Sequence, residues 1–194
     1  MAGNLFDFND PTVVLPSRFV VDTNVIIERV FAALIPRTPV PNPLQAQQAA
    51  GFFQLLLTSN MTGIVTPTAY AEIIHVVVGH LLKRFGSRQS PRLSGRQVYK
   101  RFPGYIKTLE PILQQLRFFL VTSGLLVISP DELRPIDPAT TFDGHLIELC
   151  CDYGLDTADA MILFEAERLG IESIVTMDGD MQRASANLNI YTWI

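Results

Sequence analysis

The chain has 194 residues, 48% of them hydrophobic, and carries a net charge of −4 at pH 7. This length suits one domain with a sizeable core, and no stretch reaches the ~18 uninterrupted apolar residues that a membrane-spanning helix needs. The N-terminus lacks the basic start and the apolar segment of a signal peptide, and the adjacent Cys150 and Cys151 cannot build a disulfide framework. We therefore expect a cytoplasmic protein with no membrane contact.

Short apolar runs alternate with stretches of helical periodicity along most of the chain. Thr66 followed by Pro67 is a typical helix start, and prolines and glycines separate the segments. In its first half the sequence predicts a strand at 18–22, a helix ending near Pro36, a proline-rich loop at 36–43, a helix at 44–60, a strand at 62–67 and a helix at 67–86. Helices at about 94–102 and 105–121 and a strand at 125–130 are expected next. The remainder predicts helices at 140–154 and 156–170, a strand at 172–178, a short helix or turn at 179–187 and a strand at 190–194.

Strands that alternate with helices predict a parallel sheet with helices on both faces. In such sheets ligands bind beyond the carboxyl ends of the strands. Asp22 closes the first expected strand and Asp178 the fourth, with Asp180 two residues further on. Glu72 lies on the second turn of the helix after the second strand, and Asp159 lies in the first turn of the helix before the fourth. These acids are therefore expected to converge on one edge of the sheet.

Converging carboxylates are costly for a folded protein. Two of them ~4 to 6 Å apart repel by roughly 3 to 4 kcal/mol at an effective dielectric near 20, against a total stability of about 5 to 15 kcal/mol. Mg²⁺ and Mn²⁺ prefer carboxylate and water oxygens and would relieve this repulsion. The pattern therefore indicates a site for a hard divalent cation.

Each acid taken alone also has an ordinary structural interpretation. Asp22 could cap the helix that follows it, and Asp159 could stabilise a helix dipole, although Asp156 or Thr157 is the better cap there. Glu72 could be a solvated helix residue, and Asp178 could belong to a turn. The four together, all expected at one edge of the sheet, favour the metal site.

Charge is distributed unevenly along the chain. Between Leu81 and Leu120 there are nine basic residues and one acid, whereas from Val121 to the end there are thirteen acids and three bases. Such an asymmetry suits a polyanion held beside a metal-loading cluster, but it is equally compatible with two solvated faces. The basic residues expected to contact a substrate are Lys83, Arg84, Arg88, Arg92, Arg96, Lys100 and Arg101.

Other catalytic patterns are weaker. Glu72 and His75 form a single E-x-x-H pair, but a carboxylate di-iron bundle needs a second one. The sequence has no G-x-S-x-G elbow, no P-loop and no G-x-G-x-x-G fingerprint. Phosphatases that form an aspartyl phosphate usually carry D-x-D after the first strand, and here Asn24 takes the second position. These observations leave the acidic cluster as the main candidate site.

Four segments resemble the successive motifs of PIN domains, in particular the small bacterial ribonucleases that act as VapC-type toxins. They are VVDTNVII, TPTAYAEI, DTADAMILFEAERLG and IVTMDGDM, in the order typical of the family. The resemblance covers residues 18–194 and implies a three-layer α/β/α fold with a five-stranded parallel sheet. The chain departs from the compact members of the family by a 17-residue N-terminal extension at 1–17 and a helical basic insertion at about 81–121.

The resemblance also implies a site and a reaction. Asp22, Glu72, Asp159 and Asp178 match the acidic quartet of the family, which holds Mg²⁺ or Mn²⁺, and Asp180 matches a frequent additional acid. Asn24 and Thr176 match polar positions that support the cluster. The implied reaction is hydrolysis of an RNA phosphodiester by a metal-activated water.

Two functions from different classes remain open at this point. The first is a metal-dependent endoribonuclease that acts on RNA, with the toxin of a toxin–antitoxin pair as its implied biological role. Its expected partners are then an antitoxin protein and a second copy of the chain in a homodimer. The second is a non-catalytic PIN module that binds RNA or a protein partner. The basic insertion is longer than the compact toxins need, and it could grip RNA, bind a protein or form a dimer surface.

Overall fold

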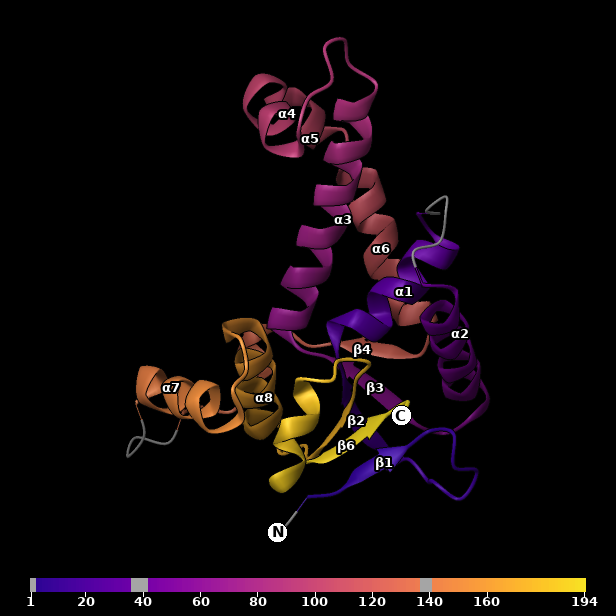
Figure 1. The fold of residues 1–194 in the computed structure, drawn as a ribbon, viewed down its shortest axis with the longest axis vertical. Helices are drawn as coiled ribbons and strands as arrows, with labels where there is room; N and C mark the ends of the chain where they lie inside the picture. The colour runs from indigo at the N-terminus through magenta and orange to yellow at the C-terminus, as the bar shows by residue number, and fades with distance from the viewer. Residues whose placement is uncertain (1–2, 36–41, 137–140) are drawn as a thin grey trace.

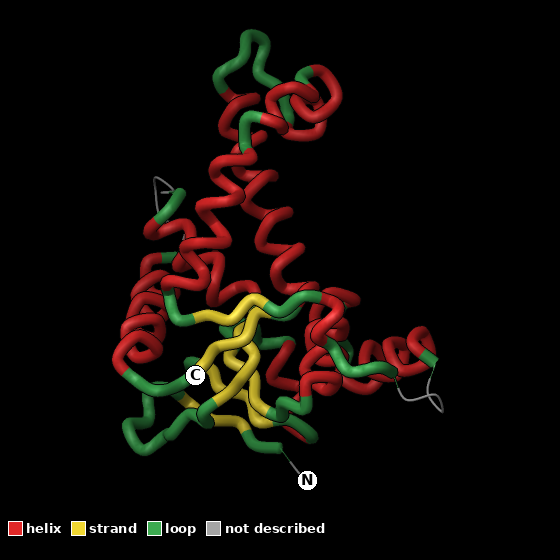
Figure 2. The backbone as a smooth tube through the Cα atoms, turned by 180° about the vertical axis from the view of Figure 1, so that it is seen from behind, coloured by secondary structure: helices red, strands yellow, loops and turns green. Residues whose placement is uncertain are grey.

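The computed structural model describes residues 3–35, 42–136 and 141–194. These residues form an α/β fold around one six-stranded sheet in which all paired strands are parallel (Figures 1 and 2). The order across the sheet is β1-β6-β5-β2-β3-β4. The strands are β1 (Leu5–Asp7), β2 (Arg18–Val21), β3 (Thr62–Val65), β4 (Leu125–Val127), β5 (Ser173–Val175) and β6 (Asn189–Thr192).

Helices connect these strands at most of the predicted places. The described α-helices are α1 (Thr23–Ala33), α2 (Pro43–Thr58), α3 (Pro67–Ser87), α4 (Gly95–Arg101), α5 (Pro103–Lys107), α6 (Glu110–Thr122), α7 (Phe142–Tyr153) and α8 (Thr157–Leu169), and two short 3-10 helices are η1 (Pro130–Glu132) and η2 (Met181–Ala186). Among the described residues, no helix combines the length and apolar character required to cross a membrane.

The strand order contains a reversal of direction at its centre. From β2 the chain moves outward through β3 to β4, then returns to the other side of β2 to form β5 and β6. Crossovers between parallel strands are right-handed, so the two directions place their helices on opposite faces of the sheet. The fold is therefore compatible with three layers, and its switch point lies between β2 and β5, where ligands of such sheets bind.

Sequence reasoning gave five strands, and this number is wrong. The segment before residue 18, expected as an extension, supplies β1 at the edge of the sheet beside β6. Side chains two residues apart lie on one face of a strand. Accordingly, the Phe6 ring stacks on Tyr191 at 4.6 Å between centroids, and the Phe8 ring stacks on Trp193 at 4.6 Å. These aromatic contacts hold a strand that is too short to be recognised by its pattern.

The basic insertion forms a projection from the sheet. Both views show α3 and α6 running side by side away from the strands, with α4 and α5 at the far end (Figures 1 and 2). The second helix expected there, at 105–121, is divided in two, because α6 begins anew at Glu110 with Pro111 in its first turn. Proline is tolerated in a first turn, where its missing N–H is not needed, but not inside a helix.

Local signals at helix ends are confirmed. The Thr66 hydroxyl accepts a hydrogen bond from the Ala69 N–H at 3.3 Å, and Pro67 follows it at the start of α3. Gly154 and Gly170 end α7 and α8 with positive φ angles of 63° and 67°, a conformation that costs glycine little. Most of the proline-rich loop expected at 36–43 lies outside the described residues.

Replacing Phe8 by alanine should loosen the β1 edge. The ring contacts Phe52, Tyr191 and Trp193, so we expect Phe8→Ala to lower the free energy of unfolding by about 1–3 kcal/mol. Trp193 is the only tryptophan of the chain, and its emission should shift to longer wavelength as water reaches it. Val14→Ala is the control, because Val14 is 82% exposed. Unchanged emission and stability in Phe8→Ala would show that β1 contributes nothing to the edge.

Candidate functional site

Asp22 lies at the centre of the switch point, directly after β2. Its Oδ1 accepts a hydrogen bond from the Thr23 N–H at 2.6 Å, which makes it the N-cap of α1, and its Oδ2 accepts one from the Thr176 hydroxyl at 2.6 Å. Only 2% of the residue is exposed. Burial raises the pKa of the Asp22 carboxyl to about 6, against the effect of these hydrogen bonds. The carboxylates of Asp178 and Glu72 add to the rise of this pKa.

A hydrogen-bond network joins the ends of β2 and β5 around Thr176. The Thr176 hydroxyl donates to Asp22 and accepts from the Asp178 N–H at 2.8 Å and from the Asn24 side-chain amide at 3.4 Å. The Asn24 side-chain oxygen, Oδ1, accepts from the Met177 N–H at 3.0 Å. Asn24 and Thr176, expected as supporting residues, are thus placed between the two aspartates and fix the loop that carries Asp178.

Asp159 reaches the same cluster from the first turn of α8. Asp156, one of the two caps expected, is the N-cap of that helix and accepts from the Asp159 N–H at 3.0 Å. The Asp159 carboxylate itself has no hydrogen bond to the described residues. Burial raises the pKa of the Asp159 carboxyl to about 7, and the charge of Asp22 is the next cause. The charges of Asp156, Asp178 and Glu72 raise the pKa of Asp159 further.

Glu165 is a buried carboxylate that sequence reasoning missed. It lies on α8, is 4% exposed, and accepts from both the Thr68 N–H at 3.0 Å and the Thr68 hydroxyl at 2.8 Å. Thr68 belongs to the first turn of α3, so this contact fixes the start of that helix against α8. Glu72, one turn later on α3, is thereby positioned relative to Asp159. The available signal was an acid between Phe164 and Ala166, on the apolar face of a predicted helix.

Several predicted residues are not brought into the cluster. Asp180, expected as an additional ligand, forms an ion pair with Arg183 at 2.7 Å and is not among the carboxylates that raise the pKa of Asp22 or Asp159. The predicted substrate-contacting residues lie instead along the outer half of α3 and beyond it, in the projection. They are Lys83, Arg84, Arg88, Arg92, Arg96, Lys100 and Arg101.

The donor chemistry of the cluster fits a hard divalent cation. Within the described ranges, no group of three or more His, Cys, Asp or Glu side chains is placed to hold a metal ion as it stands. Mg²⁺, however, keeps several waters and is usually held through one or two carboxylates. The ion pairs of the described residues include none between a lysine or arginine and any of the four acids. The Thr23 hydroxyl, beside Asp22, is buried with no described hydrogen-bond partner.

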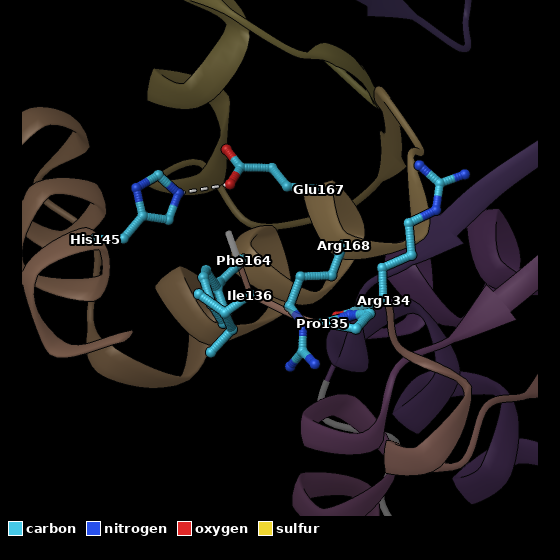
Figure 3. A pocket seen from close by; sticks show the side chains of 7 residues that line it. All are labelled: Arg134, Pro135, Ile136, His145, Phe164, Glu167 and Arg168. Carbon is cyan, nitrogen blue, oxygen red and sulfur yellow. Dashed lines mark hydrogen bonds and ion pairs between the residues drawn. The ribbon is translucent and has the colours of Figure 1, made fainter. Parts of the chain in front are cut away.

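A separate cavity of about 230 Å³ lies toward the other end of α8 (Figure 3). On one side of it His145 of α7 bonds to Glu167 of α8, with 2.6 Å between Nε2 and Oε2. This contact, with Glu148 beside it, raises the pKa of His145 against the opposing effect of burial. The pair joins α7 to α8 and explains His145 as a structural residue. The cavity is lined by Arg134, Pro135, Ile136, His145, Phe164, Glu167 and Arg168.

Comparison with models of known protein families and with curated protein sequences finds no match to this chain. The similarity to PIN domains therefore depends on the four motifs alone.

The raised pKa of Asp159 predicts how stability depends on pH. In the unfolded chain this carboxyl titrates near its ordinary value, so the folded state binds more protons and loses stability as pH rises from about 4 to about 7. In EDTA, Asp159→Asn should match wild type at pH 4 and melt higher at pH 8, by about 2–4 °C for each kcal/mol of relieved repulsion. Thermal unfolding at several pH values measures this, with the exposed Asp152→Asn as control. A constant difference across pH would contradict the electrostatic interpretation.

The contact of Glu165 with Thr68 predicts a positioning role. A glutamine can accept only one of the two hydrogen bonds, so Glu165→Gln should lower the free energy of unfolding by about 1–3 kcal/mol. It should also raise the Mn²⁺ concentration needed for half of the metal-induced thermal shift, because Glu72 is no longer held toward Asp159. Glu172→Gln is the matched control, since Glu172 is exposed. Lost stability with an unchanged Mn²⁺ requirement would restrict Glu165 to a structural role.

Proposed function

We propose that this protein is a metal-dependent endoribonuclease of the PIN type, with its active site at the cluster of Asp22, Glu72, Asp159 and Asp178. One observation carries the proposal: carboxylates from separate elements meet at the switch point of the sheet, where burial first and the neighbouring charges second raise the pKa values of Asp22 and Asp159. Perturbed carboxyl groups that converge in this way are typical of functional sites.

A structural role explains part of the cluster but not all of it. Asp22 caps α1 and Asp156 caps α8, so neither helix needs Asp159. Glu72 lies inside α3, away from its cap. A fold under selection for stability alone has no reason to keep these like charges together at a cost of several kcal/mol. A cation that is present in the functional state supplies the reason.

The acids of the cluster would have different roles in the proposed reaction. A bound Mg²⁺ or Mn²⁺ would lower the pKa of a water nucleophile and stabilise the departing oxygen of a phosphodiester. The residues best placed to hold the cation are Asp22, whose carboxylate accepts from the Thr176 hydroxyl, and Asp178, whose carboxylate accepts from the Asp180 N–H. The Asp159 carboxylate is free of described hydrogen bonds and can orient the attacking water and accept its proton.

RNA is the substrate class that the motifs and the charge distribution favour. The net charge of −4 opposes indiscriminate binding of nucleic acid, while the basic residues are concentrated in one insertion. The similarity to VapC-type toxins extends the proposal to a toxin with an antitoxin partner and to a homodimer. These biological roles follow from the similarity, whereas the nuclease chemistry follows from the cluster.

Cleavage of a mixed RNA in Mn²⁺ tests the proposal. Wild type should cut it, and EDTA should abolish the reaction. Asp22→Asn and Asp159→Asn should each reduce the rate by about 100-fold or more, because the first removes a group that would hold the cation and the second removes the group that would orient the water and accept its proton. Asp152→Asn, an exposed acid on α7, should cut like wild type. If Asp22→Asn cuts as fast as wild type, the site is assigned wrongly.

A thermal-shift measurement separates catalysis from simple binding. Mn²⁺ should raise the melting temperature of wild type and of Asp152→Asn more than that of Asp178→Asn, because the cation stabilises the state to which it binds. Equal shifts would place the metal elsewhere. A shift confined to the intact cluster, without cleavage of RNA or of single-stranded or flapped DNA, would favour the non-catalytic PIN module.

A further inference from the structure

The far end of the projection is strongly basic. We call this surface the basic tip; its residues are Lys83, Arg84, Arg88, Arg92, Arg96, Lys100, Arg101 and Lys107. All of them are exposed, and none forms an ion pair or a side-chain hydrogen bond with the described residues. Free positive charges concentrated in this way are the electrostatic signature of a polyanion-binding surface.

The basic tip is a packed structure. Helix α4 crosses the end of α3, where Val98 is fully buried and Leu82 is 6% exposed. The backbones approach so closely at Gly86 that an added Cβ would collide with the Leu93 carbonyl. A capping box between Ser94 and Gln97 fixes the first turn of α4. The charges of α4 are therefore held at defined positions relative to α3.

Aromatic side chains lie among these charges. Phe85 stacks on Tyr105 with 4.0 Å between ring centroids and meets Phe102 edge-on at 5.5 Å. Phe102 is 38% exposed, and Tyr99, beside Lys100, is 60% exposed. Exposed rings interleaved with basic side chains stack the unpaired bases of single-stranded nucleic acid, whereas duplex presents mainly phosphates and 2′-hydroxyls.

Helix α3 connects the basic tip with the acidic cluster (Figure 1). Glu72 and Lys83 are three helical turns apart, so both lie on the same side of α3. Gly79, between them, has open space where the Cβ of another residue would lie. At 1.5 Å per residue, the path from Glu72 to Arg88 is about 24 Å long, which corresponds to about seven stacked nucleotides at 3.4 Å each.

We propose that the basic tip is a binding surface for single-stranded RNA that holds the strand about seven nucleotides from the bond cut at the acidic cluster. The choice of RNA as the ligand rests on the proposed ribonuclease function. The tip supplies affinity through phosphate contacts and base stacking, and the acidic cluster, which repels phosphates, supplies little.

Fluorescence anisotropy with a labelled 20-nucleotide RNA in EDTA tests this directly and requires no cleavage. The triple variant Arg96→Ala, Lys100→Ala, Arg101→Ala should bind at least about tenfold more weakly at low salt. Its plot of log K against log salt should be shallower by about 2, since each phosphate contact on a single strand contributes about 0.7. The three residues are exposed, so the fold should be retained, as circular dichroism can verify.

A single substitution at the other end of the molecule is the matched control. Arg18 is exposed at the amino end of β2, whereas Asp22 follows the carboxyl end of the same strand. Arg18→Ala should bind RNA like wild type, whereas Arg101→Ala should bind more weakly. If Arg18→Ala and Arg101→Ala weaken RNA binding equally, or if the triple variant binds RNA like wild type, the proposal is overturned. The basic tip would then be assigned to binding a protein partner.

Substrate length tests the spacing. With a 20-nucleotide substrate the triple variant should raise KM and leave kcat unchanged, but with a trinucleotide, which is too short to reach the tip, KM should not change. An equal rise in KM for the 20-nucleotide substrate and the trinucleotide would overturn the proposed distance between the basic tip and the bond that is cut. The anisotropy result is valid even if wild type cuts no RNA, so failure of the tip and failure of the nuclease are distinguishable.

Discussion

The cost of burying the Asp22 carboxylate is the constraint on which the rest of the site depends. Asp22 is needed structurally, because one oxygen caps α1 and the other binds the threonine that follows β5. Each carboxylate oxygen has two lone pairs, so both retain acceptor capacity after these hydrogen bonds form. A capping role and a metal-binding role are therefore compatible in the same side chain. The cost of its charge, visible in its raised pKa, increases with each further acid that the fold brings to the switch point.

Helix α3 links the two halves of the proposed function. Its first turn is fixed to α8 through Glu165, and its last turns carry the basic tip. Arg84, in the last turn of α3, also suits the negative end of the helix dipole and so stabilises α3 itself. An active site made of carboxylates cannot attract RNA unaided. Basic residues at the opposite end of α3 can attract the phosphates of RNA. The same chain can therefore bind a polyanion and keep the acids that the proposed chemistry requires.

Much of this arrangement could be predicted from the sequence because its signals are local. Buried strands are apolar runs, and Thr66, Asp156 and the glycines that end α7 and α8 act on residues within one turn. What could not be predicted depends on distant partners. Strand β1 has three residues and owes its place to Tyr191 and Trp193, near the other end of the chain. Glu165 is satisfied by a residue 97 positions away. Asp180 conforms to the family motif, but an arginine one turn later on η2 competes for its carboxylate.

The acids of the cluster differ in how firmly they are held, and this difference bears on how a cation would bind. Asp22 and the loop of Asp178 are fixed by hydrogen bonds before any cation arrives, so ordering them costs no further conformational entropy. The Asp159 carboxylate has no such bond within the described residues. The described residues hold no ready group of three ligands, and burial together with the neighbouring carboxylates already raises the pKa of Asp159. Under the proposed function, the cation would complete the site by drawing Asp159 toward a partner that is already in place.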